Sequence, residues 1–227
     1  MARPAAESID LEILFEDPWL IAVNKPAGMV VHPTYKNTSG TLVNAILAHR
    51  VLHTTPGIVT RLDKDTSGLV LAALTSQIHM MVQRDAHAGH VRKDYLAVVQ
   101  GLPSPASGTI GLPLARDVSD RRKVVVTEGG AACETRYEVL ASAGAFSLVR
   151  CELVTGRTHQ IRVHLAARGW PIAGDAVYGV PHPLLRRQAL HAWRLTLPHP
   201  ITRDLFTVTA PVPADLCAAF PALDFEL

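Results

Sequence analysis

Two short segments contain most of the side chains that could do chemistry. Residues 61–68, Arg-Leu-Asp-Lys-Asp-Thr-Ser-Gly, hold two carboxylates, two cations and two hydroxyls between apolar stretches. Residues 155–164, Thr-Gly-Arg-Thr-His-Gln-Ile-Arg-Val-His, join a glycine turn to the start of an expected helix, whose first backbone N–H groups could face a phosphate. So many polar groups are hard to explain as packing alone, although a solvated turn that ends in glycine is the plain alternative for the first segment.

Several familiar site types do not fit these segments. Asp63 and Asp65 supply too few ligands for a calcium loop, and the glycine and glutamate of the EF-hand pattern are absent. On a helix, His159 and His164 would point about 140° apart, unlike the histidine pair of a zinc protease. There is no P-loop or dinucleotide fingerprint, and Ser67 lacks the flanking glycines of a hydrolase elbow. We therefore expect neither a metal nor a cofactor.

The composition predicts one elaborated domain over residues 1–227. Of these residues 48% are hydrophobic, which is enough to build a substantial core. We find no apolar run of signal-peptide or membrane-span length, and we expect a monomer. Cys133, Cys151 and Cys217 are widely separated, so we expect three buried, unreactive thiols in a reducing cytoplasm.

The charge is distributed unevenly along the chain. The formal net charge is only +2, but residues 150–194 hold seven arginines and no lysine against two acidic residues, a local net of +5. The first twenty residues are mainly acidic, and no basic residue follows Asp204. This asymmetry favours a polyanionic partner, although such charge runs also occur on ordinary solvated surfaces.

Hydrophobic spacing and breakers predict an α+β fold, with a mixed, largely antiparallel sheet flanked by a few helices. Residues 101–120 are rich in proline, glycine and serine and predict an irregular surface loop. The charged segment 61–68 falls between apolar elements. Strands are expected at residues 20–24, 29–32, 69–74, 95–99, 124–126, 135–140, 146–154, 191–197 and 205–210. Helices are expected at residues 41–52 (capped by Ser39 or Thr41), 75–89 (capped by Thr75 or Ser76), 158–168 (capped by Thr158) and 215–220.

Several segments, in family order, resemble the signature motifs of the RluA-type RNA pseudouridine synthases. The similarity extends from about Leu14 to Pro211. Besides residues 61–68, its segments are NKPAG (24–28), KDYLA (93–97), GRTHQIRVH (156–164), GD and YG (174–175 and 178–179) and LHA (190–192). The resemblance implies the pseudouridine synthase fold, an active site in a central cleft and RNA as the partner.

The resemblance also implies roles for individual residues. Asp63 would be the catalytic aspartate, Tyr95 would pack against the target uracil, and Arg162 would pair with the Asp63 carboxylate. An adjacent guanidinium favours the charged form of a carboxylate, and arginine grips a carboxylate better than lysine does. Arg61 would enter the RNA where the target base has left, or else form a surface ion pair with Asp65. Further RNA contacts are expected from Lys64, Arg157, His159, Gln160, Arg186 and Arg187.

The reaction implied is the isomerisation of uridine within RNA, which needs no cofactor. Asp63 could add to C6 of the base, attack C1′ of the ribose or act as a base at C2′. Ribosomal and transfer RNAs are both possible substrates. The chain departs from the family at Thr60, where histidine is common, and we expect it to lack an S4-like RNA-binding module ahead of the catalytic domain. A non-catalytic RNA-binding module and a metal-dependent nuclease that uses Asp63 and Asp65 are the rival functions.

Overall fold

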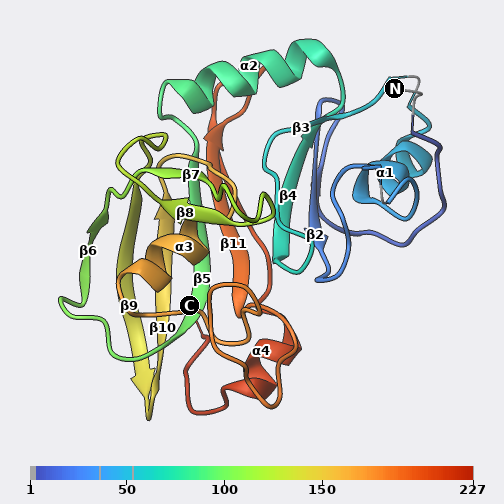
Figure 1. Ribbon diagram of the computed structural model, residues 1–227. Coiled ribbons are helices and arrows are strands. Elements are labelled where there is room, and N and C mark those ends of the chain that lie inside the picture. The colour runs from blue at the N-terminus through green and yellow to red at the C-terminus, as the bar shows by residue number, and fades with distance from the viewer. Residues whose placement is uncertain (1–3, 36, 53, 227) are drawn as a thin grey trace. The chain divides into compact units, whose positions relative to one another are not determined.

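The computed structural model describes residues 4–35, 37–52 and 54–226, which form two compact units (Figure 1). The first unit comprises the chain up to Arg92 together with Ala192–Pro211. The second comprises Lys93–His191 and the chain from Val212 onward. Each unit is built on antiparallel strand pairs with a few helices, which confirms the predicted α+β class.

The first unit is a sheet in the order β1-β2-β4-β11, with β3 paired to β4 and β12 paired to β11. The register of β2 on β4 places Lys25, the last residue of β2, opposite Gly68. Gly68 has a φ of +109°, and a Cβ there would collide with the backbone of Ala192 in β11, so this position requires glycine. The strands are β1 (Glu12–Glu16), β2 (Leu20–Lys25), β3 (Gly57–Ile58), β4 (Ser67–Ala73), β11 (Leu190–Pro198) and β12 (Leu205–Thr209).

Two capped helices complete the first unit. Helix α1 (Leu42–Arg50) begins at Thr41, which forms a capping box with Asn44, and helix α2 (Ser76–His87) begins at Thr75. Both threonine caps were among those that the sequence predicted. Residues 61–66, which we call the charged loop, lie between β3 and β4.

The second unit holds a sheet in the order β5-β10-β9-β6 and a separate β7–β8 hairpin. Helix α3 (Gln160–Ala167) packs on β9, since His164 and Gln160 both contact Thr135 there (Figure 1). Helix α4 (Ala214–Ala219) lies near the C-terminal end of the chain. The strands are β5 (Arg92–Gln100), β6 (Ser107–Ile110), β7 (Leu114–Arg116), β8 (Val124–Val126), β9 (Thr135–Ala143) and β10 (Phe146–Leu153).

Three predictions of secondary structure were wrong. Residues 29–32 form no strand, because the carbonyls of Val30 and Val31 accept hydrogen bonds from the start of α1 instead of from a sheet. Residues 101–120 contain β6 and β7, which pair with β9 and β8. Helix α3 begins after His159, which has a φ of +54°, so Thr158 is not its cap.

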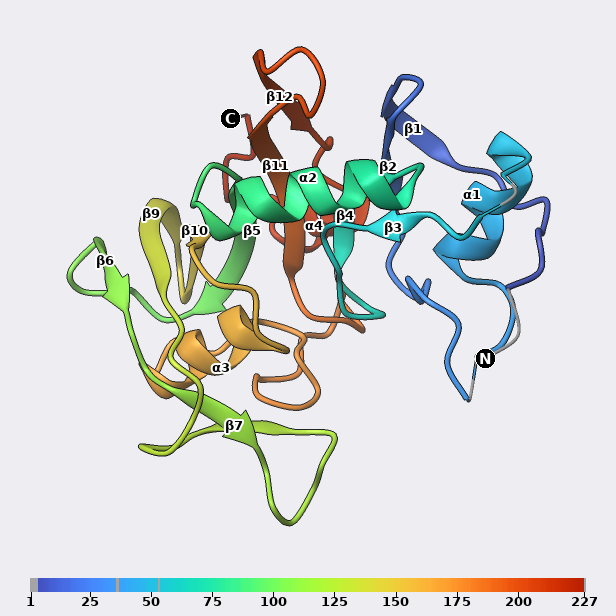
Figure 2. The ribbon, with the colours of Figure 1, turned by 90° about the horizontal axis from the view of Figure 1, so that it is seen from above.

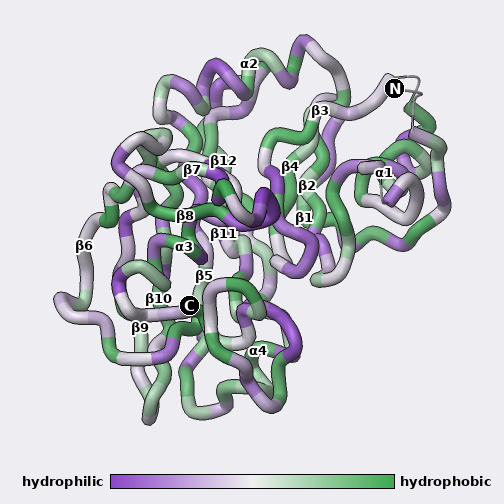
Figure 3. The backbone as a smooth tube through the Cα atoms, viewed as in Figure 1, coloured by the Kyte–Doolittle hydropathy of each residue, from purple (hydrophilic) through white to green (hydrophobic). Residues whose placement is uncertain are grey.

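Hydrophobic residues are concentrated along β2, β4 and α1 of the first unit (Figure 3), where they form its buried core. In the first unit, one face of the sheet packs on α2 and the other on α1. Among the residues described, every helix is too short or too polar to cross a lipid bilayer.

Candidate active site

A buried lysine holds the charged loop in place. The side chain of Lys25 is completely buried, and its Nζ donates to three backbone oxygens, at 2.8 Å from that of Pro26 and 2.9 Å from those of Met29 and Lys64. The Gly28 N–H donates to the same Lys64 oxygen at 2.9 Å. Because a buried ammonium is costly unless it is hydrogen-bonded, these contacts fix both the turn after β2 and the charged loop.

One residue of the charged loop packs inward, while charged residues on either side of it are exposed to solvent. Leu62 packs against the apolar cluster around α1, whereas Arg61 and Lys64 on either side are exposed. Asp63 is half-buried, and its carbonyl accepts a hydrogen bond from Thr66 N at 3.2 Å, which closes a turn. The loop therefore presents two carboxylates, the half-buried Asp63 and the exposed Asp65, and two cations from a fixed backbone.

Two neighbouring residues define the start of this loop. Thr60 is buried, and its Oγ1 accepts a hydrogen bond from Leu71 N at 3.0 Å, so it supports β4. His32 lies near Arg61: burial lowers the pKa of His32 below its usual value, and the charge of Arg61 lowers it further. His32 is therefore neutral at pH 7 and does not repel the positive charge of Arg61.

In the second unit, Arg162 forms a buried ion pair with Asp175. Its Nε donates to Oδ2 at 2.6 Å and its Nη2 to Oδ1 at 2.9 Å. The backbone N–H groups of Val177 and Tyr178 also donate to Oδ1. Burial alone would raise the pKa of Asp175, but these hydrogen bonds and the guanidinium charge outweigh it and lower that pKa below its usual value. The sequence placed Asp175 in a family motif but did not reveal this pairing.

Tyr178 connects Arg162 to two other elements of the second unit. Its ring lies 5.1 Å from the Arg162 Cζ, within the range of a cation–π contact. Its hydroxyl accepts from Val124 N of β8 at 2.8 Å and lies 2.8 Å from Nδ1 of His159. Sequence reasoning missed Tyr178 as a site residue, although it belongs to the YG motif.

The segment before α3 divides into buried and exposed residues. Gln160 is buried: its Oε1 accepts from Thr155 Oγ1 and Arg157 N, and its Nε2 donates to the Glu134 carbonyl and Thr135 Oγ1. These contacts support a structural role for Gln160 rather than an RNA contact. The side chain of Arg157 is exposed and that of His159 is partly exposed.

The two arginines at 186 and 187 also differ. Arg186 is exposed. Arg187 is buried, its Nε and Nη2 each donate to an Asp215 oxygen at 2.7 Å, and its Nη1 donates to the carbonyls of Gln188 and Leu190. The contacts of Arg187 are those of a structural residue, whereas the exposed Arg186 is accessible to a ligand.

Tyr95 lies on β5, where it is largely buried and opposite Cys151 of β10. The predicted site residues are divided between the two units. The first unit contains Asp63, Arg61 and Lys64. The other predicted site residues belong to the second unit: Tyr95, Arg157, His159, Gln160, Arg162, Arg186 and Arg187.

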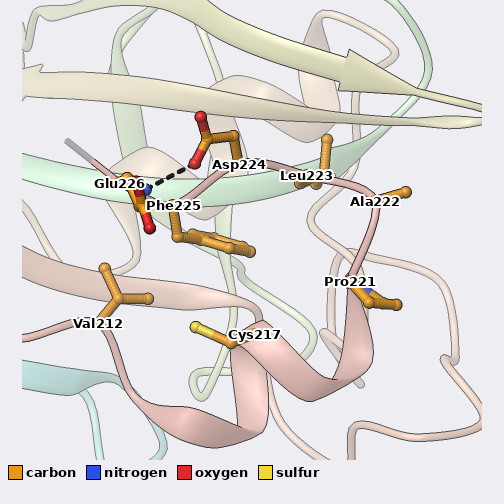
Figure 4. A pocket seen from close by; sticks show the side chains of 8 residues that line it. All are labelled: Val212, Cys217, Pro221, Ala222, Leu223, Asp224, Phe225 and Glu226. Carbon is orange, nitrogen blue, oxygen red and sulfur yellow. Dashed lines mark hydrogen bonds between the residues drawn. The ribbon is translucent and has the colours of Figure 1, made fainter.

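A pocket in the second unit is unrelated to these residues. It is lined by side chains of α4 and the segment after it, among them Cys217, Phe225 and Glu226 (Figure 4). Cys217 is exposed, which corrects the expectation of three buried thiols, whereas Cys133 and Cys151 are buried. Burial raises the pKa of the Cys151 thiol to about 12. In the part of the chain that the structure describes, no group of three or more His, Cys, Asp or Glu residues could hold a metal ion.

Comparisons with known proteins identify the family. A family model described as RNA pseudouridylate synthase matches residues 19–167. The ribosomal large subunit pseudouridine synthase D of Nitrosomonas europaea is 44% identical over 230 residues, which cover 96% of this chain and 67% of that protein. The chain belongs to the RNA pseudouridine synthase family. The uncharacterized RNA pseudouridine synthase YlyB of Bacillus subtilis is also 44% identical to this synthase, over 93% of this chain and 72% of its own length.

The fold of the synthase has solved counterparts. The human RNA pseudouridylate synthase domain containing 4 superposes with a TM-score of 0.75 at 25% sequence identity, over 92% of this chain and 91% of that chain. These findings confirm the resemblance to the RluA-type synthases and the activity that it implied, which is the isomerisation of uridine in RNA.

The contacts of Lys25 predict a loss of both stability and turnover in Lys25→Met. The substitution keeps the apolar stem but removes the donor that three backbone oxygens share, of which that of Lys64 keeps a second donor, Gly28 N. Each group left unsatisfied costs about 1–3 kcal/mol. Urea unfolding and single-turnover kinetics on RNA measure the two effects. Lys64→Met is the matched control for stability, because it removes an exposed side chain and keeps the carbonyl that Lys25 binds. Wild-type stability and turnover in Lys25→Met would show that the lysine does not hold the loop.

The two neighbouring arginines predict different effects on RNA binding. Arg186→Ala should reduce the slope of log affinity against log salt concentration by about 0.7–0.9, the value for one lost phosphate contact. Arg187→Ala should leave that slope unchanged and lower the stability, because Asp215 loses its partner. RNA titrations at several salt concentrations measure the slopes, and equal slopes for Arg186→Ala and the wild type would place the phosphate contact elsewhere.

Proposed function

We propose that this synthase converts uridines of large-subunit ribosomal RNA to pseudouridine, with Asp63 as its nucleophile or base. The ribosomal substrate is supported by the 44% identity to the pseudouridine synthase D of Nitrosomonas europaea. The reaction involves no redox change and consumes no phosphate energy, so we propose that the chain acts without a cofactor. We also propose that it acts as a monomer in the cytoplasm.

The chemistry requires one group that forms and releases a bond to the substrate or moves a proton. The N1–C1′ bond of the uridine breaks, the uracil turns, C5 bonds to C1′, the proton on C5 leaves, and N1 takes up a proton. A carboxylate can add to C6, attack C1′ or remove a proton at C2′. The fixed, half-buried position of Asp63 in the charged loop supports this role, because a nucleophile needs a defined orientation.

Arg162, Tyr95 and Arg61 complete the proposed machinery. A carboxylate that spans Nε and Nη2 of a guanidinium leaves Nη1 on the opposite side, so Asp175 fixes the direction in which Arg162 can bind a second anion. We propose that this anion is the catalytic carboxylate. Tyr95 would pack against the uracil, and the exposed Arg61 would fill the gap that the flipped base leaves.

Asp63→Asn should abolish the release of tritium from ribosomal RNA labelled at C5 of its uridines, with a rate loss of at least about 10²–10⁴-fold. The amide has nearly the same shape as the carboxylate but is a poor nucleophile and base, so RNA binding should stay close to wild type. Asp65→Asn is the matched control in the same loop. A variant that still releases tritium at the wild-type rate would rule out Asp63. Wild-type release from transfer RNA alone would keep the activity and reject the ribosomal substrate.

Arg162→Met should lower turnover at saturating RNA, because the proposed catalytic carboxylate loses the guanidinium that orients it. Single-turnover kinetics measure the loss. Arg187→Met is a matched control, since it removes an equally buried arginine paired with an aspartate in the same unit. It should lower the stability but keep turnover at saturating RNA close to wild type. Wild-type turnover in Arg162→Met would separate Arg162 from the catalytic carboxylate.

A further inference from the structure

Lys93 is a half-buried cation of the second unit that has no partner among the described residues. It lies on β5, and neither a hydrogen bond nor an ion pair joins its Nζ to any residue within 4–35, 37–52 and 54–226. Burial alone lowers the pKa of Lys93 below its usual value. The ammonium therefore loses part of its hydration, and none of these residues supplies a group in exchange.

Three other buried cations show how this protein compensates such a charge. Lys25 donates to three backbone oxygens, and Arg162 and Arg187 each form two hydrogen bonds with an aspartate. Lys93 has no such group within the described residues, so the dehydration of its charge opposes folding. A bound anion is the partner that would offset this cost.

The carboxylate next to Lys93 in the sequence points away from it. Side chains alternate along β5, so Asp94 lies on the opposite face of the strand, where its Oδ1 is 3.9 Å from Nε of Arg150. Lys93 instead shares its face with Tyr95, two residues or about 7 Å along the strand. Tyr95 is the residue proposed to pack against the target uracil, so one nucleotide can reach both side chains.

The space beside the ammonium is open. The turn that connects β10 to α3 contains Gly156 (Figure 2), and a Cβ at Gly156 would lie 3.8 Å from Lys93 Nζ. Apart from the two chain neighbours of Gly156, no other heavy atom of the described residues would lie within 4 Å of that Cβ. The glycine therefore leaves room beside the ammonium for a group from outside the chain, and Arg157 adds an exposed cation to the same turn.

Hydrogen bonds hold the turn around Gly156 in one conformation. Gln160 Oε1 accepts from Thr155 Oγ1 at 2.9 Å and from Arg157 N at 3.0 Å. Thr155 Oγ1 also accepts from Glu134 N of the adjoining chain at 3.0 Å. The opening beside the ammonium is thus formed by the protein itself, and little ordering is left to occur when a ligand binds.

We propose that Lys93 Nζ binds a backbone phosphate that flanks the target uridine, in the opening beside Gly156. The inference rests on the proposed function, since it concerns the RNA whose uracil would meet Tyr95. An ammonium binds a phosphate as a point charge, so it positions the nucleotide without reading its base. The charge of Lys93 is compensated only when the RNA is bound, which favours the complex over the free protein.

Lys93→Met tests the proposal, because methionine keeps most of the apolar stem and removes the charge. The probe is total ribosomal RNA, titrated at several salt concentrations. We expect at least about fivefold weaker binding and a loss of about 0.7–0.9 from the slope of log affinity against log salt concentration, the value for one phosphate contact. The melting temperature should equal or exceed that of wild type, because the charge has no partner among the described residues.

Arg136→Met is the matched control. It also removes a positive charge of the second unit, but this charge is already paired with Glu134 and Glu152. The control should keep the affinity and the salt slope of wild type. The phosphate contact is overturned by wild-type affinity and slope in Lys93→Met, or by an equal loss in the control. A lower melting temperature in Lys93→Met would also overturn it, since the lysine would then have a structural contact.

Gly156→Ala is a second variant, which keeps the ammonium and places a methyl group in the opening. Its contact with Lys93 Nζ at 3.8 Å is an ordinary one, so the fold should keep its stability. RNA binding should weaken at least about twofold, because the methyl group takes space that the phosphate needs. Unchanged RNA affinity in this variant would reject the opening as the place where the phosphate binds.

The two monophosphates of uridine show on which side of the nucleotide the phosphate lies. Uridine 5′-monophosphate or 3′-monophosphate should compete with RNA more strongly than uridine does, and Lys93→Met should lose this preference. A preference that persists in Lys93→Met, or none in wild type, would contradict the contact. These are binding measurements without turnover, so their failure is distinct from failure of Asp63→Asn, which is measured by tritium release.

Discussion

The buried ammonium of Lys25 is the interaction on which the arrangement of the first unit depends. Taking a charged group out of water costs several kcal/mol, and the backbone must supply oxygens to offset that cost. The turn after β2 and the charged loop provide them, so neither can move without leaving the ammonium or the carbonyls unsatisfied. The register that sets Lys25 opposite Gly68, and the close approach of Ala192 that Gly68 permits, extend this constraint into the sheet.

The second unit also contains a buried cation that must be compensated, the guanidinium of Arg162. Arg162 is held by a carboxylate rather than by carbonyls, and a planar fork on a carboxylate fixes an orientation as well as a position. The position of Asp175 depends on the backbone conformation of the preceding residue. Gly174 has a φ of +73°, and a side chain there would collide with the Arg187 carbonyl. The ammonium of Lys25 holds backbone segments in place, whereas the guanidinium of Arg162 is itself held in one orientation by Asp175. The proposed role of Arg162 requires such a fixed orientation.

The sequence predicted the regular elements well, because they depend on local signals. It predicted the polar contacts poorly, because their partners are distant in the sequence. Strand β4 and helices α1 and α2 follow from apolar spacing and threonine caps, which are local signals. The supposed strand at residues 29–32 failed because its carbonyls bind the start of α1, a partner that spacing does not reveal. Gln160 is polar in the sequence but buried in the structure, since its amide meets groups from β9 and from the turn before α3. The motifs indicated Asp63, Tyr95 and Arg162 as site residues, while the partner in the Arg162–Asp175 pair came only from the structure.

In the arginine-rich segment 150–194, the net charge counted along the sequence differs from the charge that is exposed to a ligand. Of the seven arginines between residues 150 and 194, Arg162 and Arg187 are buried in ion pairs, and Arg150 pairs with Glu138. Their charges are compensated nearby, and a phosphate would have to compete with a carboxylate to reach them. Attraction of RNA depends on cations that are both exposed and uncompensated, so within residues 150–194 the exposed Arg157 and Arg186 are better candidates for a phosphate contact than the three paired arginines.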